Sequence, residues 1–261
     1  MLIDSHCHLD CLDLDRFDGG LDGVLANARE LGVGHFLCVS IDLEAYPKML
    51  ALVEGRPEVS ISVGVHPNHR ECHEPTVDEL VALATHQQNV AIGETGLDYF
   101  RSDGDLDWQR ERFRTHIRAA RECGKPLIIH MREATADTLD ILENEHADEA
   151  GGVMHCFAED WAAAERALAL GFYISFSGIV TFRNAEALKD VARRMPAERM
   201  LVETDSPYLA PVPKRGKPNQ PGWTRYVAEH IAELRGTDYA EIERQTTANY
   251  ARLFGLPAQS A

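Results

Sequence analysis

Residues 1–8 read Met1-Leu2-Ile3-Asp4-Ser5-His6-Cys7-His8, a short apolar run that ends in two histidines separated by one residue. Side chains alternate between the two faces of a β-strand, so we expect His6 and His8 to point the same way and Cys7 the other way. Two imidazoles on one face can hold a zinc, copper, iron or nickel ion if other segments complete its coordination. Taken alone, the pair could equally be two polar residues at the end of a strand.

The same pattern recurs along the whole chain: a short apolar or β-branched run, a polar loop, and then a segment with apolar residues at helical spacing. The predicted strands are residues 2–6, 35–40, 59–65, 90–94, 126–130, 152–156, 172–177 and 200–204. Predicted helices include residues 21–31, 77–86, 108–123, 134–145, 161–170 and 185–194. Several of them end next to a glycine, which is typical of helix C-termini.

Eight strands alternating with helices predict a parallel sheet, and eight is the number that closes a (β/α)8 TIM barrel of ~250 residues. A doubly wound open sheet is the alternative. No G-x-G-x-x-G motif follows the first strand and no Walker loop is present, which argues against that alternative. A loop rich in proline, glycine and basic residues spans 207–222, and helical segments follow at 223–234 and 239–254. We interpret these segments as the eighth helix and an extra C-terminal helix of a single domain, 1–261.

Composition restricts the class of protein. The sequence has 261 residues, 44% of them hydrophobic, and a formal net charge of -16. Such a charge argues against a protein that coats nucleic acid through charge alone, but it does not exclude an enzyme that engages a few phosphates through metal ions. We find no signal peptide and no apolar run of membrane-spanning length, and the six cysteines form no CxxC pair. We therefore expect a soluble cytoplasmic protein with reduced thiols, monomeric and without an obligate protein partner.

Residues of metal-ligand type occur at the C-terminal ends of five predicted strands, which is where (β/α)8 barrels carry their chemistry. They are His6 and His8, Glu94, His130, His155 and Asp205. Polar residues are common at strand ends, so each of these residues alone indicates little. Six of them at one end of a single predicted barrel indicate a metal centre.

Six ligands are more than one catalytic zinc ion uses, because such a site keeps three protein ligands and an open position. Two divalent cations (zinc, magnesium or manganese) that share a bridging Glu94 fit the number better, an arrangement typical of phosphatases and nucleases. His6 and His8 would bind one ion, and His130 and His155 the other. Asp205 would accept the proton of the attacking water. One ion with the remaining side chains around it is the alternative.

The chain resembles the TatD-like metal-dependent hydrolases of the amidohydrolase superfamily over nearly its whole length. The resemblance rests on the following motifs: Asp4-Ser5-His6-Cys7-His8-Leu9-Asp10, Gly64-Val65-His66-Pro67, Gly93-Glu94-Thr95-Gly96-Leu97-Asp98-Tyr99, Ile129-His130, His155-Cys156-Phe157, Glu203-Thr204-Asp205-Ser206-Pro207-Tyr208-Leu209 and Thr247-Ala248-Asn249-Tyr250-Ala251-Arg252-Leu253-Phe254. It implies a divalent-metal phosphodiesterase, typically a 3'-to-5' exonuclease on DNA, with the six residues above as metal ligands. The expected substrate is a single-stranded DNA 3' end.

Two further residues are candidates for substrate binding. His66 could simply mark the end of a strand before Pro67, whereas the family resemblance suggests a contact near the scissile phosphate. Arg215 lies in the basic loop 214–221, which follows the eighth strand. A solvated charged loop is the default interpretation of this segment, but Arg215 is well placed to pair with a phosphate through two hydrogen bonds.

Two other functions are compatible with the same residues. A hydrolase of this architecture could cleave another bond, such as a cyclic amide or an ester, including the aminoacyl ester of a charged tRNA. A catalytically silent barrel that binds metal or a partner is a third possibility, against which the complete set of ligands argues.

Overall fold

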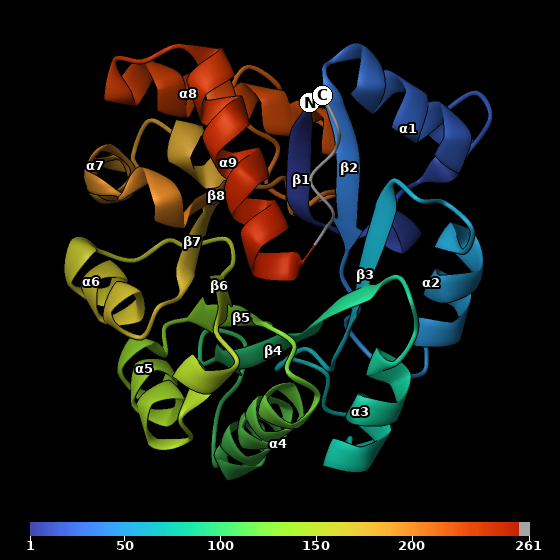
Figure 1. The fold of residues 1–261 in the computed structure, drawn as a ribbon, viewed down its shortest axis with the longest axis vertical. Helices are drawn as coiled ribbons and strands as arrows, with labels where there is room; N and C mark the ends of the chain where they lie inside the picture. Colours follow the sequence, from blue (N-terminus) through green and yellow to red (C-terminus); the bar gives the residue numbers. More distant parts are fainter. Residues whose placement is uncertain (256–261) are drawn as a thin grey trace. The chain divides into compact units, whose positions relative to one another are not determined.

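The computed structural model describes residues 1–255 of the chain (Figure 1). Within them, eight strands form one sheet in the order β1 to β8. They are β1 (Leu2–Cys7), β2 (Val33–Cys38), β3 (Val59–Val63), β4 (Asn89–Asp98), β5 (Leu127–Arg132), β6 (Gly152–Met154), β7 (Tyr173–Phe176) and β8 (Met200–Val202). A doubly wound sheet has its strands out of sequence order, so this order excludes that alternative. The predicted (β/α)8 barrel is confirmed.

Helices alternate with the strands: α1 (Leu21–Glu30), α2 (Tyr46–Val53), α3 (Val77–Ala84), α4 (Asp107–Cys123), α5 (Thr135–Asn144), α6 (Trp161–Ala169), α7 (Glu186–Arg194), α8 (Thr224–Arg235) and α9 (Tyr239–Phe254). The extra C-terminal helix is thus confirmed as α9. Helix α2 was not among the predicted segments, although its buried Tyr46, Met49 and Val53 have helical spacing and Pro47 suits a first turn. Within residues 1–255, no helix combines the length and apolar character that a membrane crossing requires.

Contacts between residues group the chain into two compact units. Among the described residues, unit 1 contains 1–38, 156–161 and 174–255. Unit 2 contains residues 39–155 and 162–173. The prediction of a single domain over 1–261 stays a prediction, and its last residues, 256–261, lie outside the described part of the chain.

In unit 1, helices α8 and α9 pack against β1 (Figure 1). The Asn249 side chain of α9 donates hydrogen bonds to the carbonyl oxygens of Ala197 and Met200, at 2.7 and 2.8 Å. Tyr250 is fully buried, and burying a side chain of this kind contributes roughly 2 kcal/mol. Helix α9 therefore anchors the beginning of β8, whose far end leads to Asp205.

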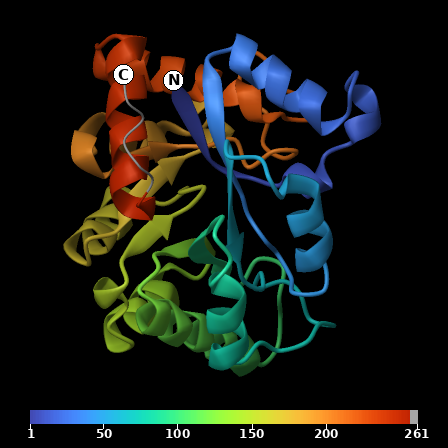
Figure 2. The same ribbon diagram turned by 45° about the vertical axis from the view of Figure 1, so that its right-hand side comes forward.

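In unit 2, helices α3 and α4 pack together beside β4 (Figure 2). Strand β4 continues to Asp98, so the predicted end at Glu94 was too early. Gly96 explains the continuation: its φ is +132°, and a Cβ atom there would lie 2.0 Å from the carbonyl oxygen of His130. Only glycine permits this close approach of β4 to β5. The approach brings the C-terminal end of β4 next to the C-terminal end of β5.

Candidate metal centre

Unit 1 brings His6, His8 and Asp205 together. The two Nε2 atoms are 3.3 Å apart, and Asp205 Oδ1 lies 3.3 Å from His8 Nε2 and 3.7 Å from His6 Nε2. Both imidazoles are buried, while the Asp205 side chain is 14% exposed. Two imidazole nitrogens and a carboxylate oxygen that face one point can hold a divalent cation. We call this group the unit 1 cluster.

The position of Asp205 depends on the segment that follows β8. The strand ends at Val202, two residues before its predicted end, and the Asp205 N–H donates to the carbonyl oxygen of His6 at 2.9 Å. Asp205 adopts a φ of +56°, a left-handed conformation that aspartate tolerates better than most residues. The alternation of a regular strand therefore does not determine where this carboxylate points.

A buried carboxylate, Asp4, holds that segment against β1. It accepts hydrogen bonds from the Thr204 N–H at 2.8 Å and from the Thr204 hydroxyl at 2.5 Å. Burial raises the pKa of Asp4 well above its usual value, although both bonds from Thr204 oppose the shift. The adjacent Glu203 is also buried and accepts a hydrogen bond from the Cys156 N–H at 2.7 Å.

Unit 2 brings four side chains together around one carboxylate oxygen, and we call them the unit 2 cluster. Glu94 Oε1 lies 2.8 Å from His155 Nε2, 3.0 Å from His130 Nδ1 and 3.4 Å from His66 Nε2. The Glu94 side chain is only 3% exposed. The ligand atoms of His66, Glu94 and His130 are close enough to share one ion.

The imidazoles control the charge of Glu94. Burial alone would raise the pKa of this carboxyl, but His155 and His66 and a hydrogen bond with His130 hold it well below its usual value. Burial lowers the pKa of His66 to about 4, although Glu94 opposes the shift. Near neutral pH the cluster therefore offers an ionised carboxylate and a neutral His66, the forms in which these groups bind metals.

Asp98 supports His130 from the other side of the ring. Its Oδ2 atom lies 3.1 Å from His130 Nε2 and accepts a hydrogen bond from the Asn68 side chain at 2.8 Å. Its Oδ1 atom accepts a hydrogen bond from the Arg101 N–H at 2.9 Å. Although burial favours its neutral form, these hydrogen bonds lower the pKa of Asp98. A carboxylate that fixes the orientation of a metal-binding imidazole is a common feature of metal sites.

No role was predicted for Asp98, although it shares strand parity with Glu94. The six predicted ligands divide evenly, with His6, His8 and Asp205 in the unit 1 cluster and Glu94, His130 and His155 in the unit 2 cluster. His66, predicted as a substrate contact, also lies in the unit 2 cluster and could bind an ion itself. Whether Glu94 bridges two ions stays a prediction.

Two side chains of unit 1 belong to the segment that follows β8. Tyr208 is 54% exposed, and its ring lies edge-to-face with that of His8 at a centroid distance of 6.2 Å. The Arg215 guanidinium lies 3.8 Å from the ring centre of Phe182 and donates to the carbonyl oxygen of Ala210 at 3.2 Å. Its role in substrate binding stays a prediction.

Comparison with known proteins agrees with this architecture. A family model described as "TatD related DNase" matches residues 3–255. The uncharacterized metal-dependent hydrolase YcfH of Escherichia coli (strain K12) is 51% identical over 258 residues, which cover 98% of this chain and 97% of that protein. The 3'-5' ssDNA/RNA exonuclease TatD of Cronobacter sakazakii is 35% identical over 246 residues, covering 92% and 93%.

A solved structure shows the same fold. The crystal structure of YjjV, a TatD homolog from Escherichia coli K12, superposes with a TM-score of 0.90 at 28% identity and covers 98% of both chains. The family model spans almost the entire chain, and the motifs that carry the resemblance contain members of both clusters. The chain therefore belongs to the TatD family of metal-dependent hydrolases.

Proposed function

We propose that this hydrolase is a 3'-to-5' exonuclease that removes nucleotides from single-stranded DNA, with two divalent cations, one for each cluster. The observation that carries the proposal is the convergence of imidazole and carboxylate atoms within each cluster, for example three imidazoles within 3.4 Å of one Glu94 oxygen. Two-cation sites are typical of enzymes that cleave phosphodiesters. The similarity to the Cronobacter sakazakii exonuclease supports the choice of bond.

The side chains of the two clusters would have different roles in the reaction. His6, His8 and Asp205 would hold one cation, and Glu94, His130 and His155 the other. When bound, divalent cations polarise phosphoryl oxygens and make water more acidic. Asp205 is the partly exposed carboxylate, so we assign it the role of accepting a proton from the attacking water. Glu94 is buried and kept ionised by its imidazoles, so its role is to hold positive charge.

The test is to incubate the purified protein with a 5'-labelled single-stranded DNA oligonucleotide in the presence of zinc, magnesium or manganese. We expect a ladder of products shortened from the 3' end, which chelation abolishes and added metal restores. An oligonucleotide blocked by a 3'-terminal phosphorothioate linkage should remain intact. Metal-loaded protein that leaves the unblocked DNA intact but cleaves an ester or a cyclic amide would show that the chosen bond is wrong.

The number of ions requires a separate measurement. Metal content after dialysis should be two ions per chain in the wild type and one in a variant in which His6 and His8 are both alanine. A wild-type value of one ion would contradict the two-cation form of the proposal without affecting the assigned substrate.

A further inference from the structure

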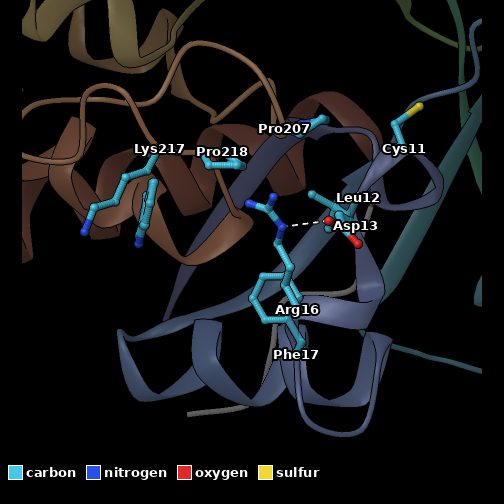
Figure 3. A pocket seen from close by; sticks show the side chains of 9 residues that line it. Cys11, Leu12, Asp13, Arg16, Phe17, Pro207, Lys217 and Pro218 are labelled. Carbon is cyan, nitrogen blue, oxygen red and sulfur yellow. Dashed lines mark hydrogen bonds and ion pairs between the residues drawn. The ribbon is translucent and has the colours of Figure 1, made fainter.

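A pocket of about 420 Å³ lies in unit 1, outside the two clusters (Figure 3). One wall comes from the short 3₁₀ turns after β1 and includes Arg16 and Phe17; the other comes from the loop after β8 and includes Pro207, Lys217 and Trp223. Cavities of this size are typical of sites for small molecules. The pocket contains none of the residues assigned above to metal or substrate.

The pocket and the unit 1 cluster are built on the same two segments of chain, because each wall of the pocket continues from a cluster residue. Cys11, which lines the first wall, donates its N–H to the carbonyl oxygen of His8 at 3.1 Å. Pro207 lies two residues after Asp205 in the second wall, and the His8 N–H donates to the carbonyl oxygen of Ser206 at 2.9 Å. The backbone of these two segments therefore links the pocket to the cluster.

Aromatic rings and cations line the pocket together. Phe17 and the largely buried Trp223 both contribute to the lining, and the Lys214 ammonium lies 5.7 Å from the Trp223 ring centre. The Arg16 Nε–H donates to Asp13 Oδ2 at 2.6 Å, and both of these exposed side chains line the pocket. In the described part of the chain, no carboxylate pairs with the Lys217 ammonium, which lines the same pocket.

This combination matches the chemistry of single-stranded nucleic acid. Bases stack on aromatic side chains without regard to sequence, while lysine and arginine meet the phosphates between them. The chain has a formal net charge of -16 and as a whole repels phosphate. The cations around the pocket can nevertheless attract a phosphate locally. An aliphatic ester or amide would make no use of two aromatic rings beside the cations of Arg16 and Lys217.

We propose that this pocket binds one nucleotide of the substrate strand, with the base against Phe17 and Trp223 and its phosphate toward Arg16 and Lys217. The inference rests on the proposed nuclease function and specifies how the strand is held next to the unit 1 cluster. It assigns Phe17, Trp223, Arg16 and Lys217 to substrate binding and leaves metal binding to the clusters.

The experiment measures binding of dAMP and of deoxyribose 5-phosphate, which lacks the base, to the metal-loaded protein. Quenching of tryptophan fluorescence reports occupancy, and a Trp223→Phe variant identifies the part of the signal that comes from the pocket. Wild-type protein should bind dAMP about tenfold more tightly than the sugar phosphate, the value expected when one base stacks on an aromatic side chain. In Phe17→Ala this ratio should fall to near one, and in Phe17→Tyr it should return.

A matched control is Phe100→Ala, because Phe100 is an exposed aromatic of unit 2 with an arginine, Arg132, over its ring. Its ratio should equal that of the wild type. Lys217→Met should weaken both ligands to the same extent, because both carry a phosphate. Equal wild-type affinities for dAMP and deoxyribose 5-phosphate, or a ratio that Phe17→Ala leaves unchanged, would overturn the proposal.

The outcome is separable from that of the nuclease assay. Protein that shortens single-stranded DNA but shows no preference for dAMP keeps the proposed function and refutes the pocket. Protein that prefers dAMP through Phe17 but never shortens DNA refutes the exonuclease and keeps a nucleotide site.

Discussion

The two clusters use the same kinds of side chain but place their carboxylates in different surroundings. In the unit 1 cluster the carboxylate, Asp205, lies beyond the end of β8 in a left-handed conformation and is 14% exposed. In the unit 2 cluster the carboxylate, Glu94, lies inside β4 and is 3% exposed, with three imidazoles around one oxygen. A further carboxylate, Asp98, supports one of those imidazoles.

This difference indicates that the two carboxylates have different chemical roles. A buried carboxylate surrounded by imidazoles has little freedom to move or to exchange protons with water, so it is suited to holding charge. A partly exposed carboxylate on a loop can contact a substrate and pass a proton to solvent.

The largest effect is expected for Asp205→Asn. The amide keeps the size of the side chain but cannot accept the proton, and loss of a general base costs about 10²- to 10⁴-fold in rate. We expect kcat on single-stranded DNA to fall by this factor, while the thermal unfolding temperature stays close to that of the wild type.

Asp18→Asn is the matched control, because Asp18 is an exposed aspartate of the same unit. Its kcat should equal the wild-type value. Turnover by Asp205→Asn at the wild-type rate would remove Asp205 from the chemistry and with it the proposed role of the unit 1 cluster.

The second prediction concerns the stability of unit 2 at acidic pH. His116 of α4 is fully buried and accepts a hydrogen bond from the Val65 N–H, next to His66, at 3.0 Å. Burial lowers the pKa of His116 from 6.5 to about 4, although a hydrogen bond with Arg112 opposes the shift. His116 therefore resists protonation in the folded state. The stability that depends on a neutral His116 is complete above pH 6.5 and is lost as the pH falls toward 4. The loss amounts to roughly 3 kcal/mol.

The measurement is the free energy of unfolding in urea between pH 7 and pH 4. Wild type should lose stability over this range more steeply than His116→Gln, by up to about 1.4 kcal/mol per pH unit. The exposed His146, replaced by asparagine because its φ is +53°, is the control and should keep the wild-type slope. Parallel curves for wild type and His116→Gln would contradict the assignment. Amide exchange should show β3 opening in acid before β1.

The third prediction separates the clusters by metal affinity. Asp98→Asn removes the charge that supports His130 without changing the size of the side chain. Loss of such a supporting carboxylate typically weakens metal binding about 10- to 100-fold. We expect this change for the ion of the unit 2 cluster alone, as measured by competition with a chelating dye.

Asp103→Asn is its control, since the Asp103 side chain is fully exposed in the same unit. Its two metal affinities should match those of the wild type. If Asp98→Asn weakened both ions equally, the clusters would not be independent, and the contrast between them would fail.

The fold could be predicted from the sequence because its signals are local. Each strand and helix has its own apolar spacing, and strand order in a barrel simply follows the chain. The six ligand residues could be located in the same way, since each lies at or just beyond the end of an apolar run of the sequence. The particular atoms that meet could not be predicted, because they depend on backbone conformation where the strands end.

Gly96 and Asp205 illustrate what could not be predicted from the sequence. Gly96 resembles a signal for the end of a strand, but its missing side chain is what lets β4 continue along β5. Ending the strand at Glu94 concealed Asp98, which strand parity would otherwise have placed beside Glu94. Asp205 directly follows the predicted strand 200–204, whereas β8 ends at Val202 and a positive φ directs the side chain.

The smallest effect is expected for Arg215→Ala. The guanidinium lies over Phe182 at an exposed position in unit 1, so it can offer one phosphate contact that solvent screens. We expect KM for single-stranded DNA to rise a few-fold at unchanged kcat. Since one cationic contact is lost, the slope of log affinity against log salt should decrease by about one.

Arg193→Ala, at an exposed arginine of α7 in the same unit, controls for the loss of one positive charge as such. It should leave both KM and the salt slope unchanged. If Arg215→Ala behaved like this control, the basic loop would contribute through Lys214 and Lys217 at the pocket instead, and the binding surface of unit 1 would lie on the Trp223 side of the loop. An increase in KM without a change in salt slope would show that Arg215 acts by holding Phe182 and Ala210 in place, since a purely structural contact is insensitive to counterions.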